Sequence, residues 1–145
     1  MILHLDLSNV KALAKECAAT LSKPGAVALV PTETVSGLVC RRADNAARDR
    51  IYALKHRADT KPLADFFPSV DSAIKHLGPL PQTAEKAARA FCPGPITVVA
   101  PDGKGSTIGF RVPDHPFILA LLQELDEALA STSANLTGQP AALTV

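Results

Sequence analysis

The segment ALASTSANLTG, residues 128–138, decides the fold, because its apolar run ends in three polar side chains spaced two apart: Ser131, Ser133 and Asn135. In an extended chain, alternate side chains point to the same face, so these three groups share one face. The apolar residues before them are typical of a buried strand, whereas the polar face needs a polar neighbour. The segment therefore predicts a strand that ends at a binding site.

Helices and short apolar strands alternate along the rest of the chain. We expect helices to begin at Ser8, at Asp44 or Asn45, at Ser69, at Thr83 and at Pro116, and strands at residues 26–30, 63–67, 96–100, 106–112 and 128–132. Short strands that are apolar on both faces are typical of α/β proteins. We predict one α/β domain over residues 1–145, with an open mixed or parallel sheet and flanking helices.

The composition excludes several classes of protein. The chain has 145 residues, a net charge of +1 and 47% apolar residues, which suffices for a core without metal or disulfide support. No apolar run reaches the roughly 18 residues that span a membrane, and the N-terminus lacks a signal-peptide pattern. The three cysteines and four histidines are scattered, so we expect neither a disulfide framework nor a metal site made by the protein. We expect a cytoplasmic protein without membrane contact.

Basic residues concentrate between positions 41 and 61, and they are Arg41, Arg42, Arg48, Arg50, Lys55, Arg57 and Lys61. Such a run is either a solvated helix face or an anion site. Lys55 and Arg57 are two apart, so they act together only if the chain leaves its helix near Lys55.

Two further segments alternate in the same way. PTETVSGL, residues 31–38, places Thr32, Thr34 and Ser36 two apart, and STIGFRVP, residues 106–113, does the same with Thr107, Gly109 and Arg111. Each pattern alone is also typical of the solvent face of a half-buried sheet. Arg111 is more informative, because a cation within a buried strand needs an anionic partner. Taken together, the segments predict one polar, cationic cleft for phosphate and carboxylate oxygens, with a nucleoside triphosphate as ligand.

Familiar catalytic motifs are absent from the sequence. There is no Ser-His-Asp pattern or HExxH, and PDGKGST lacks the spacing of a phosphate-binding P-loop. His115 is a candidate base, with a surface or helix-capping histidine as the alternative. We expect a site that works by positioning and charge neutralisation.

Five segments, in this order, resemble the YrdC/Sua5 family of threonylcarbamoyl-AMP synthases: PTETVSGL, LKHRADTKPL, CPGPITVV, IGFRVPDHP and STSANLTGQP. The resemblance runs from about Ser8 to the end of the chain. It implies a twisted sheet around a concave basic cleft. It also implies a nucleotidyltransferase that joins L-threonine, bicarbonate and ATP into threonylcarbamoyl-AMP and pyrophosphate, for the threonylcarbamoyl modification of tRNA.

The resemblance also assigns residues. It implies that threonine is bound by Thr32, Thr34, Arg111 and Ser131. It implies that the nucleotide is bound by Lys55, Arg57, Lys61, Thr107, Ser133 and Asn135, of which Lys55, Arg57, Ser133 and Asn135 are catalytic. ATP would bring Mg²⁺ with it, with no metal ligand from the protein.

The chain departs from the family in two places. Ser36 stands where the family usually has tyrosine, and the chain ends at Val145 where family members continue, so we expect a pocket open on one side. Two alternatives stay open. One is a protein of this fold that binds double-stranded RNA or tRNA without synthase activity, and the other is a paralogue that makes another carbamoyl or acyl adenylate. Threonylcarbamoyl-transfer proteins are the expected partners of a synthase.

Overall fold

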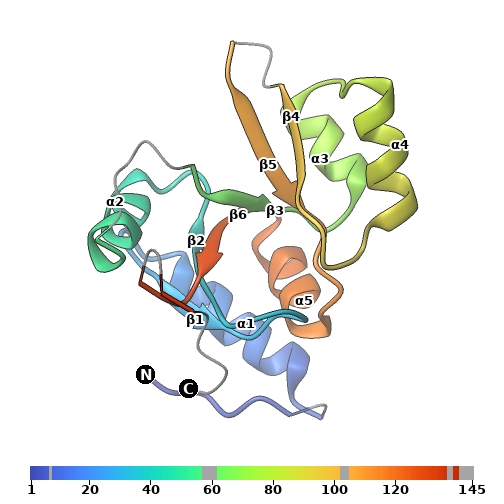
Figure 1. The fold of residues 1–145 in the computed structure, drawn as a ribbon. Coiled ribbons are helices and arrows are strands. Elements are labelled where there is room, and N and C mark those ends of the chain that lie inside the picture. The colour runs from blue at the N-terminus through green and yellow to red at the C-terminus, as the bar shows by residue number, and fades with distance from the viewer. Residues whose placement is uncertain (7, 57–61, 102–104, 137–138, 141–145) are drawn as a thin grey trace.

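A six-stranded open sheet organises the chain in the computed structural model, which describes residues 1–6, 8–56, 62–101, 105–136 and 139–140. The strands are β1 (Ala28–Val30), β2 (Gly37–Arg41), β3 (Ala64–Phe66), β4 (Val98–Pro101), β5 (Thr107–Arg111) and β6 (Leu129–Ser133). The helices are α1 (Val10–Leu21), α2 (Asn45–Leu54), α3 (Val70–Leu77), α4 (Gln82–Phe91) and α5 (Pro116–Leu125). The predicted α/β class and open mixed sheet are confirmed (Figure 1).

The strand order is β1-β2-β6-β3-β5-β4, so β6 lies in the middle of the sheet although it comes last in the chain. β3 and β5 run parallel, whereas the other neighbouring strands are antiparallel. Segments far apart in sequence therefore meet beside β6. Its neighbour β2 was not among the expected strands, because only Leu38, Val39 and Cys40 form its apolar run, between a glycine and two arginines.

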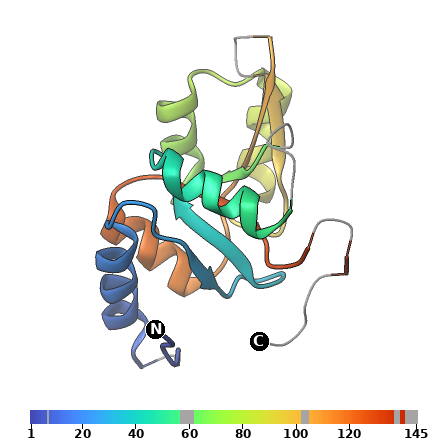
Figure 2. The same cartoon turned by 90° about the vertical axis from the view of Figure 1, so that its left-hand side faces the viewer.

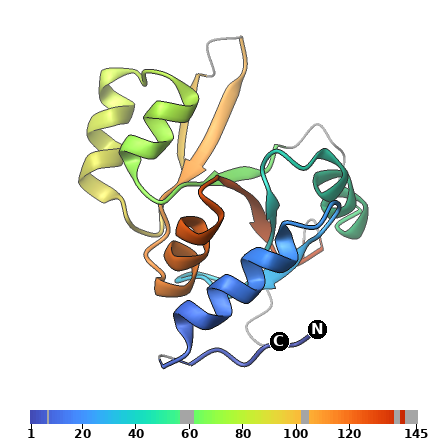
Figure 3. The same ribbon diagram turned by 180° about the vertical axis from the view of Figure 1, so that it is seen from behind.

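Helices cover both faces of the sheet. α1 and α5 pack against each other and against Val39, Phe66 and Leu129 on one face (Figure 3). On the other face, α2 lies across β2 and buries Ile51 against Cys40 (Figure 2). α3 and α4 cover the same side of the β4–β5 hairpin, which rises from one end of the sheet (Figure 1). The opposite side of this hairpin carries no helix among the described residues.

Most of the expected helix starts are correct, but two are displaced. Asp44 and Ser69 accept hydrogen bonds from first-turn amides of α2 and α3. Ser8 does not cap α1, because Asp6 accepts both its amide and its hydroxyl, and the residue before the helix is Asn9. α4 begins at Gln82, directly after Pro81, rather than at Thr83.

Asp44 gives the first testable prediction. Its carboxylate accepts from the Ala47 amide at 2.9 Å and from the Gly25 amide at 2.8 Å, and these bonds, the Ala47 bond foremost, lower its pKa. A lowered carboxyl pKa stabilises the fold above the unfolded value of 3.8 and ceases to do so as the pH falls through the folded value. Asp44→Ala is therefore expected to lower Tm by several degrees at neutral pH and by less in acid.

Thermal melts over a range of pH measure this effect. Asp49→Ala is the control, because Asp49 is an exposed carboxylate on the same helix. A loss of Tm for Asp44→Ala that is equal at all pH values would show that the charge of the cap contributes nothing.

Candidate active site

The polar site forms where β6 ends, and the sheet register determines which side chains share its face. Ser131 lies opposite Val39 and Ala64, and Ser133 lies opposite Gly37. Because Phe66 lies opposite both Leu129 and Arg111, alternate residues of β5 share this face with alternate residues of β6. Ser131, Ser133, Thr107, Gly109 and Arg111 thus occupy one face, as their alternation predicts.

The loop before β2 approaches the same face, but it is a turn and not the extended chain that its alternation suggested. The Thr32 hydroxyl accepts from the amides of Thr34 and Val35 at 3.1 and 3.2 Å, and it donates to the Val35 carbonyl at 2.7 Å. Thr32, Thr34 and Ser36 therefore do not lie on one face of a strand, although their spacing allows it. A threonine hydroxyl that satisfies nearby backbone groups favours a turn over a strand.

The turn nevertheless brings threonine side chains to the site. The hydroxyls of Thr32 and Thr34 lie 3.0 Å apart. A Cβ atom added at Gly37 would lie 3.5 Å from Ser131 Oγ and 3.8 Å from Thr32 Cγ2, so the loop and β6 meet beside this glycine. The main chains are also joined, because the Ala134 amide donates to the carbonyl of Ser36 at 2.8 Å.

Arg111 pairs with an anion, as expected for a cation within a largely buried strand, and this anion is Glu33 of the same chain. Its Nη2 donates to Glu33 Oε1, and its Nη1 donates to Thr34 Oγ1 at 3.4 Å. The guanidinium also lies over the ring of Phe66, 5.6 Å from its centroid. Glu33 was not among the expected site residues, because an extended chain would have pointed it away from Thr32 and Thr34.

Lys55 lies where the sequence predicted a helix exit. α2 ends at Leu54, Lys55 is its C-cap, and His56 has a φ of 47°, a left-handed conformation common just after helices. Lys55 is only 4% exposed, and its Nζ donates to the main-chain carbonyl of Ser133. Its expected companions Arg57 and Lys61 lie outside the described residues.

The remaining expected residues occupy the margins of the site. Asn135 Nδ2 donates to the carbonyls of Gln139 at 2.5 Å and Leu136 at 3.2 Å. Its Oδ1 is buried with no hydrogen-bond partner among the described residues. Thr107 is exposed at the outer end of β5, four residues and roughly 13 Å from Arg111 along the strand.

His115 directly precedes α5 but makes no side-chain capping bond, and its Nδ1 is buried without a partner among the described residues. Within the described ranges, no three His, Cys, Asp or Glu side chains gather as a metal site would require. The same part of the chain contains no helix long and apolar enough to cross a membrane.

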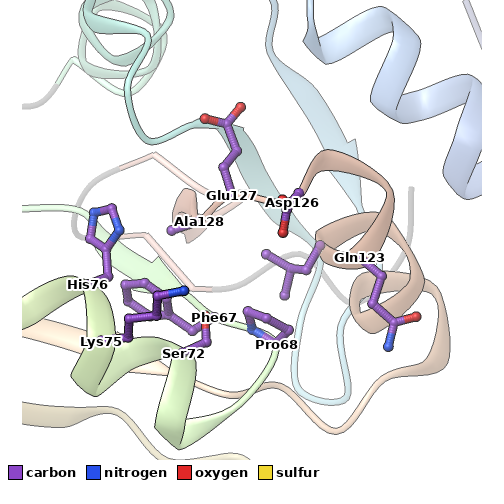
Figure 4. A pocket seen from close by; sticks show the side chains of 10 residues that line it. Phe67, Pro68, Ser72, Lys75, His76, Gln123, Asp126, Glu127 and Ala128 are labelled. Carbon is purple, nitrogen blue, oxygen red and sulfur yellow. The ribbon is translucent and has the colours of Figure 1, made fainter.

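A hollow of about 470 Å³ lies at the opposite end of β6 from the polar site (Figure 4). Ser72, Lys75 and His76 of α3 line one side, and Gln123 and Asp126 line the other. It contains none of the residues that the sequence assigned to the site.

The groups beside this hollow already pair with one another. Arg42 bonds Asp65 at 2.5 Å and His76 at 3.0 Å. Burial raises the pKa of Asp65, and its bond to Arg42 acts in the opposite direction.

The fold and the site together define a class: α/β proteins with an open sheet, in which hydroxyl and cationic side chains gather on one face beyond the part that α1 and α5 cover. The comparisons with known proteins narrow this class. The Sua5/YciO/YrdC family model, described as "telomere recombination", matches residues 20–145. The chain belongs to this family.

Two curated relatives are threonylcarbamoyl-AMP synthases. The protein from Bacillus subtilis is 33% identical over 133 residues, which cover 85% of this chain and 38% of the relative. The protein from Marinobacter nauticus is 38% identical over 128 residues, which cover 81% of this chain and 67% of the relative. The chain spans less than half the length of several curated relatives that it matches.

A solved structure resembles the whole fold. Sua5 from Pyrococcus abyssi, complexed with L-threonine, matches with a TM-score of 0.75 and 29% identity, over 90% of this chain and 41% of that one. The resemblance extends to the same open sheet and its flanking helices.

Proposed function

We propose that the chain is a threonylcarbamoyl-AMP synthase, which makes threonylcarbamoyl-AMP and pyrophosphate from L-threonine, bicarbonate and ATP. The relatives bearing that name and the related structure that holds L-threonine support this proposal. The observation that carries it within the chain is Arg111, a largely buried guanidinium on the hydroxyl-lined face of the sheet. A guanidinium in such a place suits the carboxylate of an amino acid.

The proposed roles follow the layout of the site. Arg111 binds the threonine carboxylate, and the hydroxyls of Thr32, Thr34 and Ser131 surround the rest of the amino acid. The triphosphate extends along the face of β5 toward Thr107, at a distance that a nucleotide can bridge. The nucleotide contacts come from Lys55, Arg57, Lys61, Thr107, Ser133 and Asn135.

The reaction needs charge neutralisation more than a protein nucleophile. The threonine ammonium gives up one proton to solvent, and the neutral nitrogen attacks the bicarbonate carbon. A second nitrogen proton leaves with the bicarbonate hydroxyl as water, and the carbamate remains. A carbamate oxygen then attacks the α-phosphorus of ATP, and the bond to pyrophosphate breaks. Both reactants are anions, so lysine and arginine beside them reduce their repulsion.

Mg²⁺ would reach this site on the triphosphate, where it offsets the charge of the phosphate oxygens. The side chains fit this route, because no three His, Cys, Asp or Glu side chains gather as a metal site within the described ranges. The product serves tRNA modification, so we expect the protein to act in the cytoplasm. We also expect it to pass threonylcarbamoyl-AMP to a transfer protein.

Pyrophosphate release from ATP tests the proposal. We expect release that requires both L-threonine and bicarbonate, measured with a coupled phosphate assay and confirmed by mass spectrometry of the adenylate. Reactions without threonine, without bicarbonate, or with L-valine in place of threonine are the controls. Release that ignores threonine would reject the synthase, and release with another amino acid alone would favour the paralogue that makes a different adenylate.

A further inference from the structure

The contact between Arg111 and Glu33 is a largely buried charge pair, and it lies where the proposed function requires the substrate carboxylate. Both side chains are largely buried, with 14% of Arg111 and 15% of Glu33 exposed. The contact joins one nitrogen to one oxygen, Nη2 to Oε1. A guanidinium and a carboxylate can form two parallel bonds, so this pair uses half of its capacity.

The unused half of the pair is buried. Arg111 Nε and Glu33 Oε2 are inaccessible to solvent and have no hydrogen-bond partner among the described residues. A buried donor and a buried acceptor without partners both cost free energy. The pair therefore joins β5 to the turn before β2, but it leaves one buried donor and one buried acceptor without hydrogen bonds.

The two side chains differ in how firmly they are anchored. Arg111 belongs to β5, lies in register with Phe66 of β3 and rests on its ring. Glu33 belongs to the turn before β2, and the bonds that hold this turn come from Thr32 and not from the Glu33 side chain. Glu33 can separate from Arg111 without disrupting any strand pairing, whereas movement of Arg111 would disrupt the pairing of β5.

We propose that Glu33 is an internal competitor for Arg111: its carboxylate occupies the position of the substrate carboxylate, and the amino acid must displace it in order to bind. This inference rests on the proposed function, because it identifies the ligand of Arg111 as an amino-acid carboxylate. The bound carboxylate engages Arg111 through two bonds and satisfies the nitrogen that the resting pair leaves unpartnered. Glu33 thus sets the threonine affinity of the site.

Calorimetric titration of the full chain with L-threonine tests the competition. Glu33→Gln removes the charge and keeps the shape, so we expect threonine to bind about tenfold more tightly. L-threonine amide has no carboxylate and need not displace Glu33, so its affinity is expected to stay within about twofold of the original value. Glu127→Gln is the matched control, because Glu127 pairs with Arg41 away from the site.

The outcomes separate the inference from the proposed function. Threonine binding that is unchanged or weaker in Glu33→Gln overturns the competition, even if the unaltered protein makes threonylcarbamoyl-AMP. Equal gains for threonine and its amide also overturn it, because a general opening of the site would then explain both. Absence of threonine binding to every form overturns the proposed function and the inference together.

A second variant guards against misfolding of the first. Glu33→Asp keeps the charge but shortens the side chain by one methylene, so its carboxylate lies farther from Arg111 and pairs with it more weakly. We expect an intermediate gain in threonine affinity. Melting curves without ligand establish that each variant is folded at the temperature of the titration.

Discussion

Replacing Arg111 with methionine is expected to lower kcat/KM for L-threonine by about a hundredfold or more, the typical result of removing a desolvated cation from a charged ligand. The affinity for ATP is expected to change far less, because Arg111 is assigned to the carboxylate of threonine and not to the nucleotide. Pyrophosphate release at varied threonine and varied ATP separates these two effects.

The single variant would also destabilise the fold, and a second substitution corrects for this. Arg111→Met leaves Glu33 as a buried charge without a partner, which typically costs about 3–5 kcal/mol. Combining Arg111→Met with Glu33→Gln removes both charges, so we expect the double variant to regain most of the lost Tm but none of the lost activity. Recovery of stability without recovery of turnover identifies Arg111 as a ligand of the substrate.

A matched control exists on the surface of α4. Arg89 bonds Glu85 and Asp71, each at 2.9 Å, but its side chain is 49% exposed, and α4 packs on the side of β5 that carries Phe110, opposite to Arg111. Exposed pairs of this kind contribute little to stability. Arg89→Met should therefore leave kcat/KM and Tm nearly unchanged, and turnover within about threefold of normal in the Arg111 double variant would contradict the assigned role.

The sequence predicts those parts of the site that depend on local regularity. Alternation is a property of any extended chain, so the face shared by Ser131 and Ser133 on β6 follows once the strand is recognised, as does the face shared by Thr107 and Arg111 on β5. That these two faces coincide depends on the pairing of both strands with β3, which is not local. The end of α2 before Lys55 is also local, because the helix is capped at Asp44 and its buried stripe, Ala47 and Ile51, ends one turn earlier.

The parts that the sequence could not predict depend on contacts between distant residues or on competing local bonds. The Thr32 hydroxyl turns the loop before β2, and the alternation of Thr32 with Thr34 conceals this. Burial indicated that Arg111 needs an anion, but only the tertiary fold brings Glu33 to it across 78 residues. A buried arginine can be paired either with a carboxylate of the protein or with a carboxylate of the substrate. The sequence around Arg111 is the same in both cases, so it cannot distinguish them.

Replacing Lys55 with methionine should produce the second large effect, and this effect has two sources. The Lys55 ammonium donates to the main-chain carbonyl of Ser133, so it ties the end of α2 to the end of β6. Its proposed second role is to place a positive charge beside the phosphates. Methionine fills the same slot without charge or donor, so we expect a loss of about 1–3 kcal/mol in unfolding free energy and of about a hundredfold in kcat.

The variant Lys55→Arg tests whether the site needs only a positive charge or needs that charge at the position of the lysine ammonium. Lys55 is 4% exposed, so the larger planar guanidinium of Lys55→Arg does not fit where the ammonium lies. If the charge alone mattered, Lys55→Arg would restore turnover to near its normal value. We expect no such rescue, because arginine cannot reproduce the bond from Lys55 to the Ser133 carbonyl. That bond keeps the residues that follow Ser133, including Asn135, in place for the nucleotide.

The control for Lys55 is Lys86→Met, which removes an exposed ammonium from α4, on the far side of the sheet from the site. Its turnover and melting temperature are expected to match those of the unaltered protein. Titration with ATP then completes the comparison, because loss of ATP affinity in Lys55→Met with normal threonine affinity assigns the lysine to the nucleotide. Loss of threonine affinity with normal ATP affinity would instead place Lys55 at the amino-acid end of the site and exchange the proposed positions of the two substrates.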